Sequence, residues 1–170
     1  MLIILGGLPG SGKTTLAHEL ARELGAVHLR IDSIETAIRG ARSTEMNDTG
    51  YRVGYAVAED NLKLGRTVVA DSVNPLTITR AAWLAVASRS GVPAIELELV
   101  CSDRGEHRRR VEARTADIDG LRLPTWREVV EREYEPWLGA HARIETSRRT
   151  VVESVAELRG ALSSIENRPR

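Results

Sequence analysis

The stretch GGLPGSGKTT, residues 6–15, follows the apolar run LIIL and decides the fold. Its letters from Gly7 to Thr14 fit the pattern G-x-x-x-x-G-K-[ST], in which glycines let backbone N–H groups turn inward around phosphate oxygens. The mechanism requires an apolar strand before this pattern and a helix after it. The stretch therefore predicts a phosphate-binding loop for ATP or GTP. The alternative is a glycine-rich turn that carries a lysine by chance.

The residue types within the loop predict separate roles. We expect Lys13 to reach the β- and γ-phosphates and the Thr14 hydroxyl to ligate Mg²⁺. The helix that begins near Lys13 would direct its positive end at the same phosphates. The predicted nucleotide-binding residues are Gly7, Leu8, Pro9, Gly10, Ser11, Gly12, Lys13, Thr14 and Thr15.

Short apolar runs alternate with helical patterns along the chain, which is typical of an α/β fold with a parallel sheet. The expected strands cover residues 2–7, 26–32, 67–72, 94–102 and 142–147. The expected helices cover residues 13–24, 49–64, 75–90, 104–114, 125–137 and 150–165. Asn74-Pro75 is expected to cap the third helix, and Thr125 with Glu128 to open the fifth. Charged Glu96 and Glu98 indicate that the fourth strand has a less buried face or lies near an edge.

Length and composition predict one domain over residues 1–166, with a frayed tail at 167–170. The 24 basic residues balance 24 acidic ones, so no overall field attracts nucleic acid. No run reaches the ~18 apolar residues of a membrane span. The single Cys101 fits a reducing compartment and is expected to be a small buried hydrophobe. We therefore expect a cytoplasmic protein that does not bind membranes; the oligomeric state is not readable.

Two aspartates stand at the ends of predicted strands: Asp32 in RIDSIE and Asp71 in VVADSVNP. Ligands of open α/β sheets bind beyond the carboxyl ends of the strands, so both carboxylates should lie beside the phosphate loop. One can hold Mg²⁺ or its waters, and the other can accept a proton from an attacking hydroxyl. Alternatively, Asp32 with Glu35 forms a capping box, and Asp71 caps the turn before Asn74.

The segment RGEHRRRVEAR, residues 104–114, carries five arginines. On a helix, Arg110 and Arg114 project from one face, and a planar guanidinium clamps phosphate well. We expect residues 104–123 to form a lid whose Arg110 and Arg114 close over the γ-phosphate. The other three arginines fit a solvated basic face instead, and His18 and His107 are expected on helix surfaces.

A groove for a nucleic acid strand would need aromatic platforms between the basic residues. Most aromatic residues fall on helix stripes, where core packing is the better interpretation; Trp126, Tyr134 and Trp137 share one such stripe. Tyr51 and Tyr55 lie near the irregular segment 40–50 and can touch an acceptor. Substrate recognition is expected in segments 40–50 and 115–123.

Other classes of protein that contain a phosphate-binding loop are not favoured. A GTPase would need guanine-reading motifs; DIDG at residues 117–120 fits D-x-x-G, but no N-K-x-D follows. The signature of transporter ATPases is absent, and motor ATPases are usually larger. A compact phosphotransferase with ATP as donor remains.

The chain resembles the small P-loop kinases that include the polynucleotide 5′-hydroxyl kinase domain and, more distantly, chloramphenicol phosphotransferases and zeta toxins. The resemblance covers about residues 3–137 and is carried by GLPGSGKTTLA, LRIDSI, GRTVVADSVNPLTITRAAW, HRRRVEAR, GLRLPTW and EYEPW. It implies a three-layer fold with a five-stranded parallel sheet in the order 2-3-1-4-5. It also implies an ATP donor, whose base would lie near Thr146 and Ser147.

The same resemblance assigns roles to single residues. It implies that Asp32 is the general base on the acceptor hydroxyl, and that Arg110 and Arg114 are the lid arginines. A D-x-T-N segment followed by an arginine corresponds to Asp71, Asn74 and Arg80. Val73 stands where threonine is usual, which affects only contacts made by that hydroxyl.

These observations predict a Mg²⁺- and ATP-dependent kinase that phosphorylates a hydroxyl of a small molecule. The expected catalytic residues are Asp32, Lys13, Arg110 and Arg114. The expected acceptor contacts are Asp32, Asp71, Arg80 and Tyr51, and the expected metal ligands are Thr14 and Asp71. The alternatives are a polynucleotide 5′-hydroxyl kinase and a nucleotide-binding regulatory ATPase without a dedicated acceptor.

Overall fold

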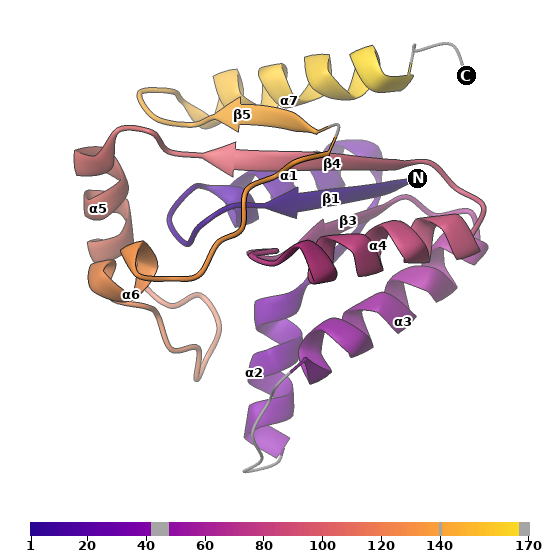
Figure 1. The fold of residues 1–170 in the computed structure, drawn as a ribbon, viewed down its shortest axis with the longest axis horizontal. Coiled ribbons are helices and arrows are strands. Elements are labelled where there is room, and N and C mark those ends of the chain that lie inside the picture. Colours follow the sequence, from indigo (N-terminus) through magenta and orange to yellow (C-terminus); the bar gives the residue numbers. More distant parts are fainter. Residues whose placement is uncertain (42–47, 140, 167–170) are drawn as a thin grey trace.

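A parallel sheet of five strands forms the centre of the protein in the computed structural model, which describes residues 1–41, 48–139 and 141–166 (Figure 1). The strand order is β2-β3-β1-β4-β5, and every neighbouring pair is parallel. This order confirms the expected fold class. The strands are β1 (Leu2–Gly6), β2 (Val27–Arg30), β3 (Val68–Asp71), β4 (Ala94–Val100) and β5 (Ala142–Glu145).

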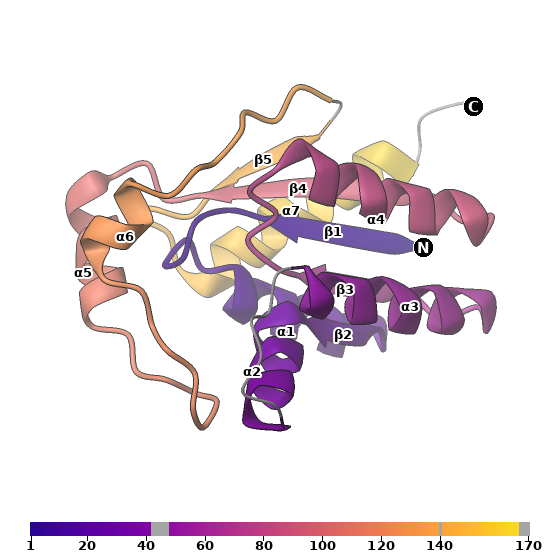
Figure 2. The same cartoon turned by 60° about the horizontal axis from the view of Figure 1, so that its bottom comes forward.

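Helices cover both faces of the sheet, so that three layers result (Figure 2). On one face, Ile3 and Leu5 of β1 pack in a core with α1 (Lys13–Leu24) and α7 (Val151–Glu166). On the other face, Leu2 and Ile4 pack with α3 (Thr49–Lys63) and α4 (Thr77–Arg89). Strand β1 is apolar throughout because both of its faces are buried.

Three further helices lie at the edge of the sheet where the strands end (Figure 2). Helix α2 (Ile31–Ala41) follows β2 directly and projects away from the sheet. Helix α5 (Arg104–Glu112) and the short helix α6 (Trp126–Val130) lie beyond the phosphate loop and are joined by residues 113–125. This edge therefore gathers α2, the phosphate loop and the segment predicted to be a lid.

The expected cap at Asn74-Pro75 is wrong, because α4 begins only at Thr77. Asn74 adopts a left-handed conformation with φ of 49° and is fully buried. Its side-chain amide donates to the Leu5 carbonyl (2.7 Å), and its Oδ1 accepts from Trp83 Nε1 (3.1 Å). Asn74 thus joins β1 to α4, and satisfying those two buried partners prevents it from capping the helix.

The capping box of Thr125 and Glu128 is confirmed, but the helix that it opens ends at Val130. The expected stripe to Trp137 is therefore not helical. Two hydrogen bonds hold the later part of this segment: Glu135 N donates to the Pro75 carbonyl (2.8 Å), and Trp137 Nε1 donates to the Tyr134 hydroxyl (2.8 Å). Strand β4 lies between β1 and β5 rather than at an edge, although Glu96 and Glu98 do lie on its less buried face.

Some expectations concern residues outside the described ranges. Residues 42–47 of the segment 40–50 and the tail 167–170 are not described, so the predictions made for them stay predictions. Within the described residues, no helix combines the length and the apolar character that crossing a membrane requires.

Candidate active site

The phosphate loop occupies residues 7–12 between β1 and α1, as the motif predicts. Gly10 and Gly12 have φ angles of 85° and 89°, which residues with a Cβ adopt only with strain. At Gly10 a Cβ would also lie 2.6 Å from the Val111 side chain. The turn therefore needs glycine both for its backbone conformation and for its close approach to α5.

Three side chains hold carbonyl groups of this loop. Lys13 Nζ donates to the Leu8 carbonyl (3.0 Å), His107 Nε2 to the Pro9 carbonyl (2.8 Å) and Thr146 Oγ1 to the Ser11 carbonyl (3.0 Å). The contacts from α5 and from the residue after β5 fix the loop before any ligand arrives. Such preorganisation lowers the entropic cost of binding. His107 is buried, so the expectation that it lies on a helix surface is wrong.

Lys13 is buried at the start of α1, and its charge is costly there. Burial lowers the pKa of Lys13 to about 8, although the charges of Asp71 and Asp32 act in the opposite direction. The amine therefore remains mostly protonated at neutral pH but is poorly solvated. An anion bound against it would replace the missing solvation.

Asp71 ends β3 and is only 3% exposed. Burial acts to raise the pKa of Asp71, but hydrogen bonds from His28 and Thr14 and the charge of Lys13 outweigh it and hold the pKa below its usual value. The ring nitrogen Nε2 of His28 lies 3.3 Å from Asp71 Oδ2. Asp71 is thus an oriented carboxylate beside Lys13 and Thr14, and the sequence did not indicate His28 as its partner.

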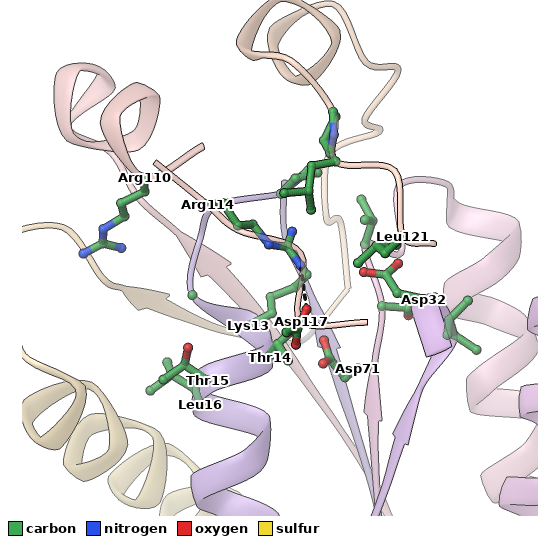
Figure 3. A pocket seen from close by; sticks show the side chains of 18 of the residues that line it. Lys13, Thr14, Thr15, Leu16, Asp32, Asp71, Arg110, Arg114, Asp117 and Leu121 are labelled. Carbon is green, nitrogen blue, oxygen red and sulfur yellow. Dashed lines mark ion pairs between the residues drawn. The ribbon is translucent and has the colours of Figure 1, made fainter. Parts of the chain in front are cut away.

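Asp32 lies in the first turn of α2, where its side chain is 39% exposed. It belongs to the helix and does not cap it, which removes the capping interpretation as its role. Arg30 Nη2 lies 3.9 Å from its carboxylate. Asp32, Asp71 and Lys13 line the same cavity, so the structure brings together the two predicted carboxylates and the loop lysine (Figure 3).

An ion pair ties the lid segment to the sheet edge. Arg30, which is 8% exposed at the end of β2, donates from Nη1 and Nη2 to Asp117 over 2.5 and 3.0 Å. The Arg30 hydrogen bonds, against a smaller effect of burial, lower the pKa of Asp117 to about 2. Asp117 is the first residue of the DIDG segment. The sequence shows both residues but gives no sign that they pair across 87 positions.

The two predicted lid arginines do not share one helix face, because α5 ends at Glu112. Arg110 donates to the hydroxyl and carbonyl of Thr146 (3.0 and 2.8 Å) and to Glu106 (2.6 Å). Arg114 lies close to Lys13 in the view of Figure 3 and 4.0 Å from Asp117. Arg114 is therefore placed toward the phosphate loop, whereas Arg110 is placed at the far wall beside Thr146.

These residues line one cavity of about 940 Å³. At one end its walls include Thr15, Arg110, Thr146, Arg149 and Ser154. At the other end they include residues of α2, residues 120–124, and Tyr51, Val73 and Pro75. The phosphate loop, Lys13 and Asp71 lie between these ends. The arrangement can hold two ligands that meet near Lys13 and Asp32.

Tyr51 and Arg80 differ in their relation to this cavity. Tyr51 lines it, and the Tyr51 hydroxyl accepts from the backbone N–H of Asn74 (3.2 Å). Arg80 does not line it. Arg80 is 5% exposed and donates to the carbonyls of Asn74, Glu135 and Pro136, while its guanidinium stacks 4.8 Å from the Trp137 ring. The structure gives Arg80 a packing role and does not bring it to the predicted acceptor.

The residues present fit a magnesium ion. The Thr14 hydroxyl and the Asp71 carboxylate lie together beside Lys13, and both are oxygen donors. Among the described residues, no group of three or more acidic, histidine or cysteine side chains forms a complete metal cage. Mg²⁺ typically takes one or two protein ligands and completes its shell with phosphate oxygens and waters.

Residues 2–135 match the family AAA_33, described as an AAA domain, and the chain belongs to this family. The curated relative "Replication factor C large subunit" of Pyrobaculum arsenaticum is 28% identical over 173 residues, which include 96% of this chain. The chain spans only 39% of that relative's length.

Solved structures share the whole fold. The APS kinase CysC of Mycobacterium tuberculosis, in complex with AMPPNP and APS, is 20% identical with a TM-score of 0.70, covering 95% of this chain and 96% of that one. A gluconokinase of Sinorhizobium meliloti is 17% identical (TM-score 0.68, 96% and 91% covered). Chaetomium thermophilum Kti12 with ADP-AlF3 is 22% identical (TM-score 0.67, 95% and 98% covered). The fold is thus that of small P-loop kinases, while the closer resemblance to polynucleotide kinases, chloramphenicol phosphotransferases and zeta toxins stays a prediction.

Proposed function

We propose that this protein is a kinase that transfers the γ-phosphate of ATP to a hydroxyl group of a small molecule. One observation carries the proposal: the phosphate loop, Asp32 and Asp117 of the proposed lid line one cavity, and Arg30 holds Asp117 at its wall. A protein that only hydrolyses ATP needs no second compartment beside its phosphate loop. The family match and the kinase neighbours support the same reaction class.

The donor nucleotide would lie along the loop. Lys13 would bind the β- and γ-phosphates, and Thr14 with Asp71 would hold Mg²⁺, which neutralises charge on the phosphates. Arg110, which donates to Thr146, would contact the base end, and Arg114 would contact the γ-phosphate. The relatives solved with AMPPNP and with ADP-AlF3 support a nucleotide at this position.

The acceptor hydroxyl would lie at Asp32. Its carboxylate would accept the hydroxyl proton as the oxygen attacks the γ-phosphorus and the bond to the β-γ bridging oxygen breaks, so that ADP leaves. The transition state of this transfer is largely dissociative, so alignment and charge neutralisation contribute more than the strength of the base. Closure of the lid would keep water away from the phosphoryl group.

The test compares Asp32→Asn with wild type and with Asp60→Asn, a control at an exposed position of α3. Each protein is incubated with γ-labelled ATP, Mg²⁺ and a panel of nucleosides, sugars, aminoglycosides and 5′-hydroxyl oligonucleotides. We expect label on an acceptor, a loss of about a hundredfold in Asp32→Asn, and nearly unchanged ATP affinity in that variant.

Three results would count against the proposal. Label released only as free phosphate with every acceptor would favour a regulatory ATPase. Transfer at the wild-type rate by Asp32→Asn would remove Asp32 as the base. Transfer confined to oligonucleotides, with steep salt dependence, would identify the polynucleotide kinase alternative instead.

A further inference from the structure

Besides Ile31, four residues of α2 line the cavity: Asp32, Glu35, Thr36 and Arg39. Their spacing of i, i+3, i+4 and i+7 places them on one face of the helix. Seven residues correspond to about 10 Å along a helix axis. Helix α2 follows β2 directly and projects away from the sheet (Figure 1), and Arg39 comes about two helical turns after Asp32.

A second arginine reaches the same region from another part of the chain. Arg132 follows α6 and also lines the cavity. Burial raises the pKa of Glu35, the charge of Asp32 adds to this effect, and the charges of Arg39 and Arg132 oppose it. Arg39 and Arg132, which come from separate parts of the chain, therefore both line the cavity that Glu35 lines.

These two arginines differ from the third arginine at this end of the cavity. Arg122 forms an ion pair with Glu128 over 2.5 Å, which occupies its guanidinium. Within residues 1–41, 48–139 and 141–166, the ion pairs of the structure include neither Arg39 nor Arg132. Arg39 and Arg132 are thus exposed cations that line the cavity, and no described carboxylate forms an ion pair with either.

The donor does not require this pair. Lys13, Arg114 and the loop amides already surround the expected position of the β- and γ-phosphates, and Arg110 lies at the opposite end. The same cavity is also lined by apolar side chains: Val73, Pro75, Leu121 and Leu123. The cavity wall therefore combines a position for a hydroxyl at Asp32, apolar side chains and the two cations.

We propose that Arg39 and Arg132 form an anion subsite, and that the phosphate acceptor is an anionic compound whose phosphate, sulfate or carboxylate group binds there. The compound presents its reactive hydroxyl to Asp32 and its anionic group to the two arginines, within about two helical turns of the hydroxyl. A planar guanidinium pairs with two oxygens of such a group at once. The inference rests on the proposed kinase function for the hydroxyl, but the anion subsite itself can be tested without it.

The first experiment uses inorganic phosphate as the probe. Wild-type protein is saturated with Mg²⁺ and AMPPNP, so that the loop is filled, and phosphate binding is then measured by calorimetry at low ionic strength. We expect saturable binding that Arg39→Gln and Arg132→Gln each weaken about tenfold, since a hydrogen bond to a charged group contributes on that order. The control Arg66→Gln, at an exposed position outside the cavity, should bind as wild type does. Absence of saturable binding, or equal binding by all four proteins, would overturn the subsite.

The second experiment compares acceptors that differ only in an anionic group: adenosine with adenosine 3′-monophosphate, and glucose with glucose 6-phosphate. A matched 5′-hydroxyl oligonucleotide is the polyanionic arm. We expect KM for the anionic member of a pair to be at least tenfold lower, and Arg39→Gln to remove most of that difference while kcat changes little. Arg39→Lys should restore only part of it, because an ammonium lacks the bidentate fork.

The dependence of KM on salt concentration distinguishes an anionic small molecule from a nucleic acid. A single phosphate on a small molecule gives a shallow dependence of KM on ionic strength, whereas a nucleic acid backbone gives a steep one. The two hypotheses also fail differently. If phosphate binding depends on Arg39 and Arg132 but no acceptor is phosphorylated, the anion subsite is supported and the kinase proposal is refuted. If acceptors are phosphorylated with equal KM for the neutral and the anionic member of each pair, the kinase proposal is supported and the anion subsite is refuted.

Discussion

The ion pair between Arg30 and Asp117 joins the proposed lid to the end of β2, and we expect Asp117→Asn to loosen the lid. A pKa near 2 instead of 3.8 corresponds to about 2.4 kcal/mol of interaction between the ionised carboxylate and its surroundings. The Asp117 side chain is 51% exposed, so solvent screening reduces this to about 1 kcal/mol. Asparagine keeps one hydrogen-bond acceptor but removes the charge. The equilibrium for lid opening should therefore rise about fivefold.

Limited trypsin digestion under native conditions measures this opening, because Arg114 and Arg122 lie on either side of Asp117 in the lid. When the lid recloses faster than it is cut, the cleavage rate follows the open population. We expect Asp117→Asn to be cut within residues 113–125 about five times faster than wild type. Asp119→Asn changes an exposed carboxylate of the same loop and should be cut at the wild-type rate.

The sign of the pH dependence follows from the lowered pKa. The folded-state pKa of Asp117 is depressed, so the stabilisation is complete above about pH 4 and is lost as the pH falls toward 2. Lid amides should lose hydrogen-exchange protection over that window in wild type and less in Asp117→Asn. Equal cleavage rates for wild type, Asp117→Asn and Asp119→Asn at neutral pH would refute the reasoning, because the ion pair would then contribute nothing to closure.

Two further predictions concern the loop lysine and the buried arginine. Because burial holds the pKa of Lys13 at about 8, its amine loses its proton between pH 7 and pH 9, and the dissociation constant for ATP should increase about tenfold over that range. Lys13→Arg should remove this pH dependence. An unchanged dissociation constant in wild type at pH 9 would contradict the lowered pKa. Arg80→Ala should lower the free energy of unfolding, measured in urea, by about 3 kcal/mol, because Arg80 donates to three backbone carbonyls. Since these carbonyls lie outside the cavity, the transfer rate per folded molecule should stay unchanged. A slower transfer at unchanged stability would instead support the acceptor contact expected from the sequence.

Local sequence was sufficient to predict features whose residues are adjacent in the chain. The strand of residues 2–6, the glycine positions of the loop and Lys13 are adjacent in the chain, so the motif determines their relative geometry. The alternation of apolar runs and helices likewise determines a parallel sheet, because βαβ connections leave few alternatives. The two cores on either side of β1 follow from the same pattern.

Errors arose where a residue has a partner far along the chain. Asn74-Pro75 reads as a helix cap, but Asn74 bonds to Leu5 and Trp83, and those buried contacts outweigh capping. Trp137 continues a helical stripe in the sequence, but the helix ends at Val130 and the chain then packs along α4. His107 reads as a surface residue, but its ring carries a hydrogen bond to the phosphate loop.

The amino-acid sequence by itself determined a phosphate-binding loop on a parallel α/β sheet, with Asp32 and Asp71 at its carboxyl edge, because local patterns and the geometry of parallel strands place these groups. Only the tertiary structure decided that Arg30 binds Asp117, that His28 orients Asp71, that Arg110 bonds to Thr146 while Arg114 lies near Asp117, and that Arg39 and Arg132 line the same cavity. Those pairings join residues from separate elements, and their energies depend on burial and distance, which no spacing along the chain specifies.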